Sequence, residues 1–140
     1  ISFLPLGMDV YDAQCFLRGS KYDEKKYREF VLHLRESLIQ QNYIDEVRED
    51  EWITMFEGHS INLDDQFSFR WQLANSHCVY LFEILEKKDI IKKLKLDNTI
   101  NRFFNIKNVA QTRYSYFPKP RGAEDIDKIV INIMTHLGKF

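Results

Sequence analysis

The sequence predicts a single, mainly α-helical domain with a minor β element, and three observations lead to that prediction. The chain has 140 residues, of which 44% are hydrophobic and 29% are charged, a composition typical of one globular domain. Breakers are scarce, with 5 Gly and 3 Pro, and they lie between long uninterrupted segments. Most of those segments repeat apolar residues at helical spacing, whereas residues 66–73 alternate with period two.

Two helices are predicted in the first part of the chain. Ser20 and Asp23 have the spacing of a capping box, and helical periodicity then predicts an amphipathic helix over 21–41. Farther on, Asp50 and Gly58 provide an N-cap and a C-cap for a short helix. The apolar positions of the longer helix are Tyr27, Phe30, Val31, Leu34 and Leu38.

The spacing of apolar residues changes twice in the middle of the chain. Residues 66–73 predict a strand, because aromatic and polar side chains alternate along them. Asn75 or Ser76 then provides an N-cap for a helix that ends at about Lys88. The apolar series at 90–96 that follows has no clear period.

Three more helices are predicted in the C-terminal part. A short one begins at about Asp97, and another spans 109–117, with Asn108 as its N-cap and Pro118 closing it. The last helix spans 126–137, where apolar residues follow the i, i+3, i+4, i+7 pattern.

The two parts of the chain resemble each other weakly at an offset of 47 residues. Tyr43 and Ile44 correspond to Ile90 and Ile91, and in each part a helix precedes the pair and a short capped helix follows it. Helical periodicity shared by unrelated segments also produces such matches. An internal duplication is therefore one interpretation of the pattern.

Charge is divided between the two halves of the domain, 1–65 and 66–140. The first half has 7 Lys and Arg against 14 Asp and Glu, and the second has 13 against 7, so net charges of −7 and +6 underlie the total of −1. The basic excess is sharpest between Lys87 and Arg121. Such a surface attracts anions, and a solvated helix face is the alternative interpretation.

Nothing in the sequence indicates an enzyme, a metal or a cofactor. No nucleophile-elbow, Walker or dinucleotide glycine pattern occurs. Cys15 and Cys78 lie far apart and are expected as reduced core thiols. His59, Asp64 and Asp65 lie close together, but a polar loop accounts for the same residues. We therefore predict no catalytic residues, no metal and no cofactor.

A cytoplasmic location without membrane contact is expected. Residues 1–20 contain no basic region followed by an apolar run, so they do not resemble a signal peptide. The chain begins at Ile1, and a preceding segment could have carried a targeting signal.

Residues 98–117 have the outline of a helix-turn-helix, with the turn at about 105–107. In this interpretation Ala110, Tyr114 and Phe117 seat the second helix on the core. Residues with the chemistry to bind DNA then face outward or flank the helix. They are Lys107, Asn108, Gln111, Thr112, Arg113, Ser115, Lys119 and Arg121.

These residue types match the groups that duplex DNA presents. Asn and Gln pair bidentately with adenine, Arg pairs with guanine, and short hydroxyls reach bases or phosphates. The flanking cations would hold phosphates, with 118–122 projecting as a basic, wing-like loop. Two alternatives remain open: a pair of ordinary core helices with a polar face, and a single-strand binder in which Tyr114, Tyr116 and Phe117 stack on unpaired bases.

A family resemblance rests on the order of motifs in the second half of the chain. These are Phe69-x-Trp71, Leu81 to Leu85, Ile90-Ile91, Ile100 to Phe104, and Asn108. Their order resembles the C-terminal part of the RteC-type regulators found with mobile elements of Bacteroidetes. That family is largely helical and ends in a winged-helix-like domain, so the resemblance implies DNA binding and transcriptional control. It covers about half the chain.

The expected function is therefore that of a DNA-binding regulatory protein. The alternative is a non-catalytic helical module that binds a protein partner, or a second copy of itself, through the acidic half. Charge alone does not separate these two functions.

Overall fold

Each stretch of helical periodicity in the sequence becomes a helix. The computed structural model describes residues 15–57, 67–93 and 96–138. The helices in these ranges are α1 (Glu24–Gln40), α2 (Glu49–Glu57), α3 (Asn75–Lys87), α4 (Leu96–Phe104), α5 (Val109–Tyr116) and α6 (Glu124–Leu137). The prediction of a mainly helical fold is confirmed.

The start of α1 differs from the predicted capping box. Asp23 is itself the N-cap, and its side chain accepts a hydrogen bond of 2.9 Å from the backbone N–H of Lys26. The hydroxyl of Ser20 instead donates to the carboxylate of Asp89, in the turn after α3. Ser20 therefore joins the segment before α1 to the second half of the chain.

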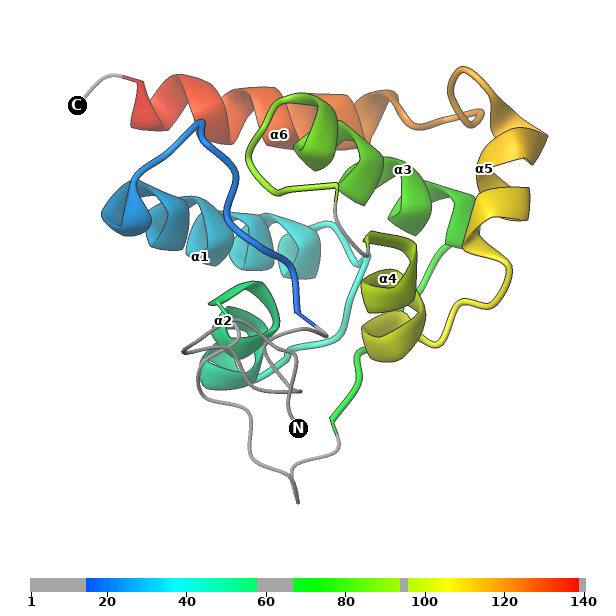
Figure 1. Cartoon of the computed structure of the whole chain (residues 1–140), viewed down its shortest axis with the longest axis horizontal. Helices are drawn as coiled ribbons and strands as arrows, with labels where there is room; N and C mark the ends of the chain where they lie inside the picture. The colour runs from blue at the N-terminus through cyan, green and yellow to red at the C-terminus, as the bar shows by residue number, and fades with distance from the viewer. Residues whose placement is uncertain (1–14, 58–66, 94–95, 139–140) are drawn as a thin grey trace, which may run out of the picture.

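Packing interleaves the two halves of the chain. α1 packs on α2 and most extensively on α6, whereas α3 packs on α4, α5 and α6. In Figure 1, α6 runs across the top of the molecule, the start of α1 lies on the left and α5 lies at the right-hand edge. One hydrophobic core collects residues from both halves, and the rings of Phe16 and Phe82 stack in it at 4.5 Å. Its largest fully buried side chains include Trp52, Phe30, Phe56, Phe82 and Phe103.

The predicted strand at 66–73 does not form in its described residues. Phe69 and Trp71 do point into the core while Arg70 is exposed, as period two requires. The segment forms one β bridge, Ile44–Trp71, and the Phe69 N–H donates at 2.7 Å to the Phe103 carbonyl near the end of the helix α4 and not to a strand. The β element in the described ranges is therefore limited to isolated bridges.

The turns after α1 and α3 share the same local geometry at the offset of 47 residues. Asn42 and Asp89 both adopt left-handed backbone conformations, with φ of 63° and 59°. The next N–H donates back into the helix in both turns, from Tyr43 to the carbonyl of Leu38 and from Ile90 to that of Leu85, each at 2.9 Å. Ile44 and Ile91 then each form an antiparallel bridge. The short helices α2 and α4 begin and end at the same offset.

Candidate nucleic-acid interface

The connection between α4 and α5 is a tight loop of four residues, 105–108. Asn105 and Asn108 both adopt left-handed conformations, with φ of 57° and 58°, which asparagine tolerates better than most residues. Ile106 is buried between them, and its carbonyl accepts a hydrogen bond of 3.0 Å from the Asn101 side chain. Asparagine thus makes the turn where a helix-turn-helix often has glycine.

The helix α5 is rotated about its axis relative to the sequence prediction. Val109 is buried, and Arg113 and Tyr116, one and two turns farther on, are half-buried. The expectation that Ala110, Tyr114 and Phe117 seat α5 on the core is wrong, because all three are exposed. The exposed fractions of the two aromatic side chains are 85% for Tyr114 and 76% for Phe117.

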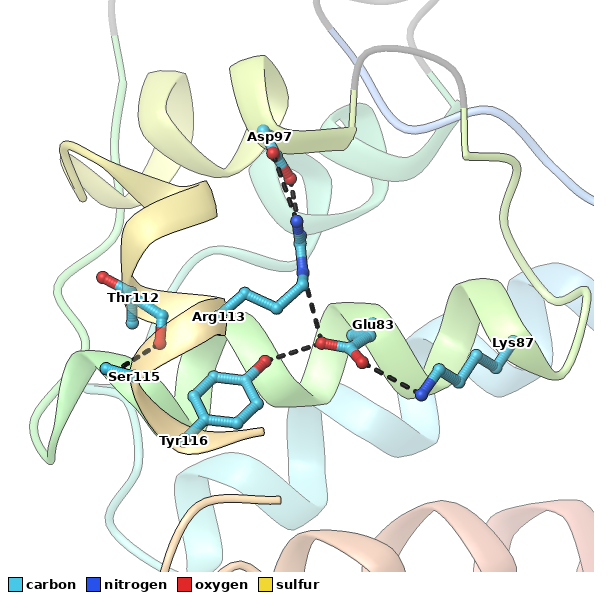
Figure 2. A network of polar contacts seen from close by, with 7 residues as sticks. All are labelled: Glu83, Lys87, Asp97, Thr112, Arg113, Ser115 and Tyr116. Carbon is cyan, nitrogen blue, oxygen red and sulfur yellow. Dashed lines mark hydrogen bonds and ion pairs between the residues drawn. The ribbon is translucent and has the colours of Figure 1, made fainter. Parts of the chain in front are cut away.

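A buried carboxylate on α3 accounts for this rotation. Glu83 is only 7% exposed, and α5 supplies two donors to it. The hydroxyl of Tyr116 donates to Glu83 Oε2 at 2.7 Å, and Arg113 Nε donates to the same oxygen at 3.2 Å. Lys87 forms an ion pair with Oε1 at 3.0 Å. An ionised group at this depth requires such donors, so α5 turns its polar side chains toward Glu83 (Figure 2).

The guanidinium of Arg113 also joins α5 to α4. Its Nη2 donates to Asp97 Oδ1 at 2.6 Å, and its Nη1 donates to Oδ2 at 3.3 Å. The side chain is 28% exposed and points into the junction of α3, α4 and α5, as Figure 2 shows. Arg113 is therefore held by carboxylates of its own chain.

The network lowers the pKa of the Glu83 carboxyl. Burial by itself would raise this pKa, but the hydrogen bonds from Tyr116 and Lys87 and the charges of Lys87 and Arg113 outweigh burial. Burial and the bond to Glu83 raise the pKa of Tyr116, so its phenol remains a donor. Glu83 is accordingly ionised at neutral pH.

The sequence does contain a signal for this network. Every residue from Cys78 to Leu85 is buried, and Glu83 is the one charged residue among them. A carboxylate within such an apolar run requires a partner from another element. Helical periodicity alone does not reveal this requirement, so the sequence prediction missed Glu83 and Asp97 as partners of Arg113 and Tyr116 as a donor to Glu83.

The remaining predicted residues of α5 and its loop face solvent to different degrees. Lys107, Asn108, Gln111 and Ser115 are exposed, whereas Thr112 is half-buried. Asn108 occupies the N-cap position of α5 without a side-chain capping bond. Among the residues that the structure describes, Lys107 has no ion-pair partner. These residues place exposed polar side chains along the outer side of α5, from the loop before it to Ser115.

The loop 117–123 after α5 is fastened to two helices. Lys119 forms an ion pair of 2.5 Å with Asp127 on α6, and the same carboxylate accepts a bond of 2.8 Å from the Tyr80 hydroxyl. His77 Nε2 donates to the Arg121 carbonyl at 2.9 Å, and Arg121 is exposed. The loop contains no strand, so the wing-like loop expected at 118–122 is not a β wing.

Two pockets lie apart from the outer side of α5. A pocket of about 630 Å³ lies between α1, α2 and residues 16–18, and its lining mixes acidic, basic and apolar side chains. A second pocket, of about 380 Å³, lies beside the Glu83–Arg113–Asp97 network. Four of the ionised groups that line the second pocket already pair with one another: Glu83, Lys87, Asp97 and Arg113. Neither pocket includes Lys107, Asn108, Gln111 or Ser115.

Comparison with family models, curated proteins and solved structures finds no match to this chain. The resemblance to RteC-type regulators therefore stays a prediction.

No helix within the described ranges is both long and apolar enough to span a bilayer. Cys15 and Cys78 are buried and form no disulfide. His59, Asp64 and Asp65 lie outside the described residues.

Proposed function

We propose that this protein binds DNA through the outer side of α5 and the loops at both ends of that helix. The observation that carries the proposal is the exposed polar face that begins at Lys107 and continues through Asn108, Gln111 and Ser115. Side-chain amides and hydroxyls at the N-terminal end of a helix have the chemistry to contact base edges in a major groove. Lys107 and Arg121 stand at the two ends of this face and would hold phosphates.

The charge of the segment supports an anionic ligand. From Asn98 to Ala123 the chain contains five Lys and Arg residues and no Asp or Glu. Arg113 and Lys119 are paired with acids from other elements, which reduces the field of this segment. Lys107 and Arg121 have no ion-pair partner in the described ranges and remain available for phosphates.

The arrangement of α3, α4 and α5 supports the same function. The three helices contact one another, and a short loop joins the last two, as in a helix-turn-helix. We infer that α5 is the groove-reading helix of this unit. The resemblance to RteC-type regulators has the same implication, and transcriptional control would follow from it.

The matching turns after α1 and α3 support an internal duplication. On this inference, one unit of helix, left-handed turn, bridge and short helix was copied, and the second copy became basic. The helices α5 and α6 follow both copies, with α5 packed on α3 and α6 on α1. DNA binding would then belong to the second copy only.

Arg113 has a positioning role in this proposal. Base reading by Arg113 was the expectation from the sequence, but both ends of its guanidinium face carboxylates of this chain. Releasing it for guanine would leave Glu83 with fewer donors. Gln111 and Asn108 are therefore the proposed base-reading residues, and Arg113 fixes the orientation of the helix that carries them.

The proposal is tested by fluorescence anisotropy with a random-sequence DNA duplex between roughly 50 and 200 mM salt. The test variant is Lys107→Glu/Arg121→Glu, which spares the ion pairs of Arg113 and Lys119. The matched control is Lys21→Glu/Lys25→Glu, which changes net charge equally at the start of α1, on the left in Figure 1, while α5 lies on the right.

We expect binding that weakens steeply with salt, and a salt slope that falls by about 0.9 for each phosphate contact the test variant loses. The control variant should bind like the unmodified protein. Equal weakening in both variants would contradict a localised interface. No binding at low salt would favour the alternative function, a protein-interaction module.

A further inference from the structure

Two aromatic side chains at the C-terminal end of α5, Tyr114 and Phe117, are largely exposed. Tyr114 and Phe117 are the only Phe, Tyr or Trp residues in the exposed class within the described ranges. The other aromatic side chains there are buried or half-buried. Large exposed apolar side chains that cluster on one element commonly mark a binding surface.

Tyr114 lies in α5, and Phe117 is the C-cap residue that follows it and keeps a helical φ of −55°, so their spacing places both side chains on the same side of the helix. Residues three apart on a helix are neighbours on its surface, and here they are offset by about 4.5 Å along the axis. Gln111 precedes Tyr114 by three residues and is exposed as well. The aromatic pair therefore continues the polar face proposed to read DNA, toward the loop that carries Arg121.

The surroundings of the pair favour nucleic acid over protein. A protein interface surrounds its aromatic anchors with further apolar surface that becomes fully buried. Around Tyr114 and Phe117 the exposed residues of α5 and its loops are mostly polar or basic, among them Lys107, Gln111 and Arg121, and the small Ala110 and Pro118 are the exposed apolar ones. Aromatic side chains among cations are typical of surfaces that stack unpaired bases and hold the adjoining phosphates.

Double-stranded DNA alone would not bind through Tyr114 and Phe117. A helix of eight residues is only about 12 Å long, and groove-reading helices contact bases mainly through their N-terminal residues. Tyr114 and Phe117 lie at the other end of α5, beyond that contact. Bases inside a duplex are also stacked on one another, so they offer no free face to an aromatic ring.

We propose that Tyr114 and Phe117 stack on unpaired bases of a DNA strand that continues from the duplex held by the N-terminal part of α5. The preferred ligand is then a junction between duplex and single-stranded DNA. This inference rests on the proposed function, because the duplex side of the junction is held by Lys107, Asn108 and Gln111.

The test compares four fluorescent probes by anisotropy at one salt concentration: a blunt duplex, the same duplex with a single-stranded thymidine tail, the same duplex with a uridine ribonucleotide tail, and the thymidine strand alone. The test variants are Tyr114→Ala, Phe117→Ala and the double variant, and Tyr114→Phe keeps a stacking ring. Ile131→Ala is the matched control, because Ile131 is a 51% exposed apolar side chain on α6. Thermal unfolding checks that every variant folds.

The tailed duplex should bind more tightly than the blunt duplex. Each alanine substitution should weaken binding to the tailed duplex about 5- to 150-fold, whereas Tyr114→Phe and Ile131→Ala should not. A 2-aminopurine base in the tail should lose fluorescence on stacking against the unmodified protein and keep it with the double variant.

The outcomes separate this inference from the proposed function. If blunt and tailed duplexes bind equally and the alanine variants change neither, stacking is overturned while duplex binding stands. If the tail strand binds through the aromatic pair and the blunt duplex does not bind, the duplex proposal fails and stacking stands. Tighter binding of a ribonucleotide tail overturns the assignment to DNA. Self-association that the double variant abolishes overturns the inference in favour of a protein partner.

Discussion

At the scale of single residues, the carboxyl group of Glu83 lies where an ionised side chain is stable only if donors surround it. Tyr116, Arg113 and Lys87 provide those donors from α5 and from the next turn of α3. Because the bonds to Tyr116 and Arg113 cross between helices, they fix the rotation of α5 as well as satisfying the carboxylate. In a helix of only 8 residues, hydrophobic periodicity constrains this rotation less strongly than the buried carboxylate does.

Glu83→Gln should lower the free energy of unfolding by about 1–3 kcal/mol at neutral pH, because the amide is a weaker acceptor and carries no charge. The folded-state pKa of Glu83 lies below its ordinary value of 4.5, so the ionised form stabilises the fold above that value. This contribution is lost as the pH falls through the folded-state pKa.

Urea unfolding of both proteins from neutral to acidic pH measures this effect. The difference in stability should shrink once the pH falls below about 4.5. Glu86→Gln on the same helix is the control, since Glu86 is more exposed. A difference that stays constant with pH would mean that Glu83 acts through packing and not through its charge.

At the scale of elements, the segment before α1 forms a short paired contact with the turn after α3. Gly19 N–H donates to the Ile90 carbonyl at 2.8 Å, and Lys92 N–H donates to that of Leu17 at 2.8 Å. The two backbones approach so closely at Gly19 that a Cβ there would overlap the carbonyl oxygen of Asp89. Glycine is therefore needed at this position because a side chain would not fit, and not because of the backbone dihedral angles.

Gly19→Ala should destabilise the protein by about 1–3 kcal/mol, because the added methyl group must push the two segments apart. Chemical denaturation measures the change. Gly138→Ala is the matched control: its Cβ would lie 3.3 Å from the nearest atom, the Met134 carbonyl oxygen, and should cost less. Equal effects would show that the close approach at Gly19 does not decide the cost.

The positions of the helices were predictable, but the orientation of α5 and the pairing of 66–73 were not. Periodicity depends on neighbours along the chain, and it placed α5 within one residue of its observed end at Tyr116. Which side of α5 faces inward depends on Glu83, which is thirty residues earlier in the sequence than Arg113. A strand likewise needs a partner strand, which the alternation of Phe69 and Trp71 does not supply.

For the candidate site, exposure of Lys107, Asn108, Gln111 and Ser115 is confirmed, whereas the ion pairs of Arg113 and Lys119 depend on distant residues.

At the scale of the whole molecule, the acidic and basic halves share one core. Trp52 of α2 contacts the rings of Phe69 and Phe104, and Phe16 contacts Phe82. Removing either half would therefore expose large apolar side chains of the other.

A fragment of residues 66–140 should fail to unfold cooperatively. It lacks α1 and α2, which contribute core residues such as Phe30, Trp52 and Phe56. Circular dichroism on heating checks this, with the whole chain as the control. A sharp thermal transition in the fragment would show that the basic half is an independent domain.

The packing of α1 on α6 also affects how the chain folds while it is being synthesised. α3, α4 and α5 are close in sequence and can begin to pack as they leave the ribosome. α1 is made before them, yet its most extensive packing is with α6, which follows all of the other described helices in the sequence. Domains usually fold from the N-terminus as translation proceeds. The part of the apolar face of α1 that packs on α6 therefore stays uncovered until α6 has been made, whereas α2 can cover its share earlier.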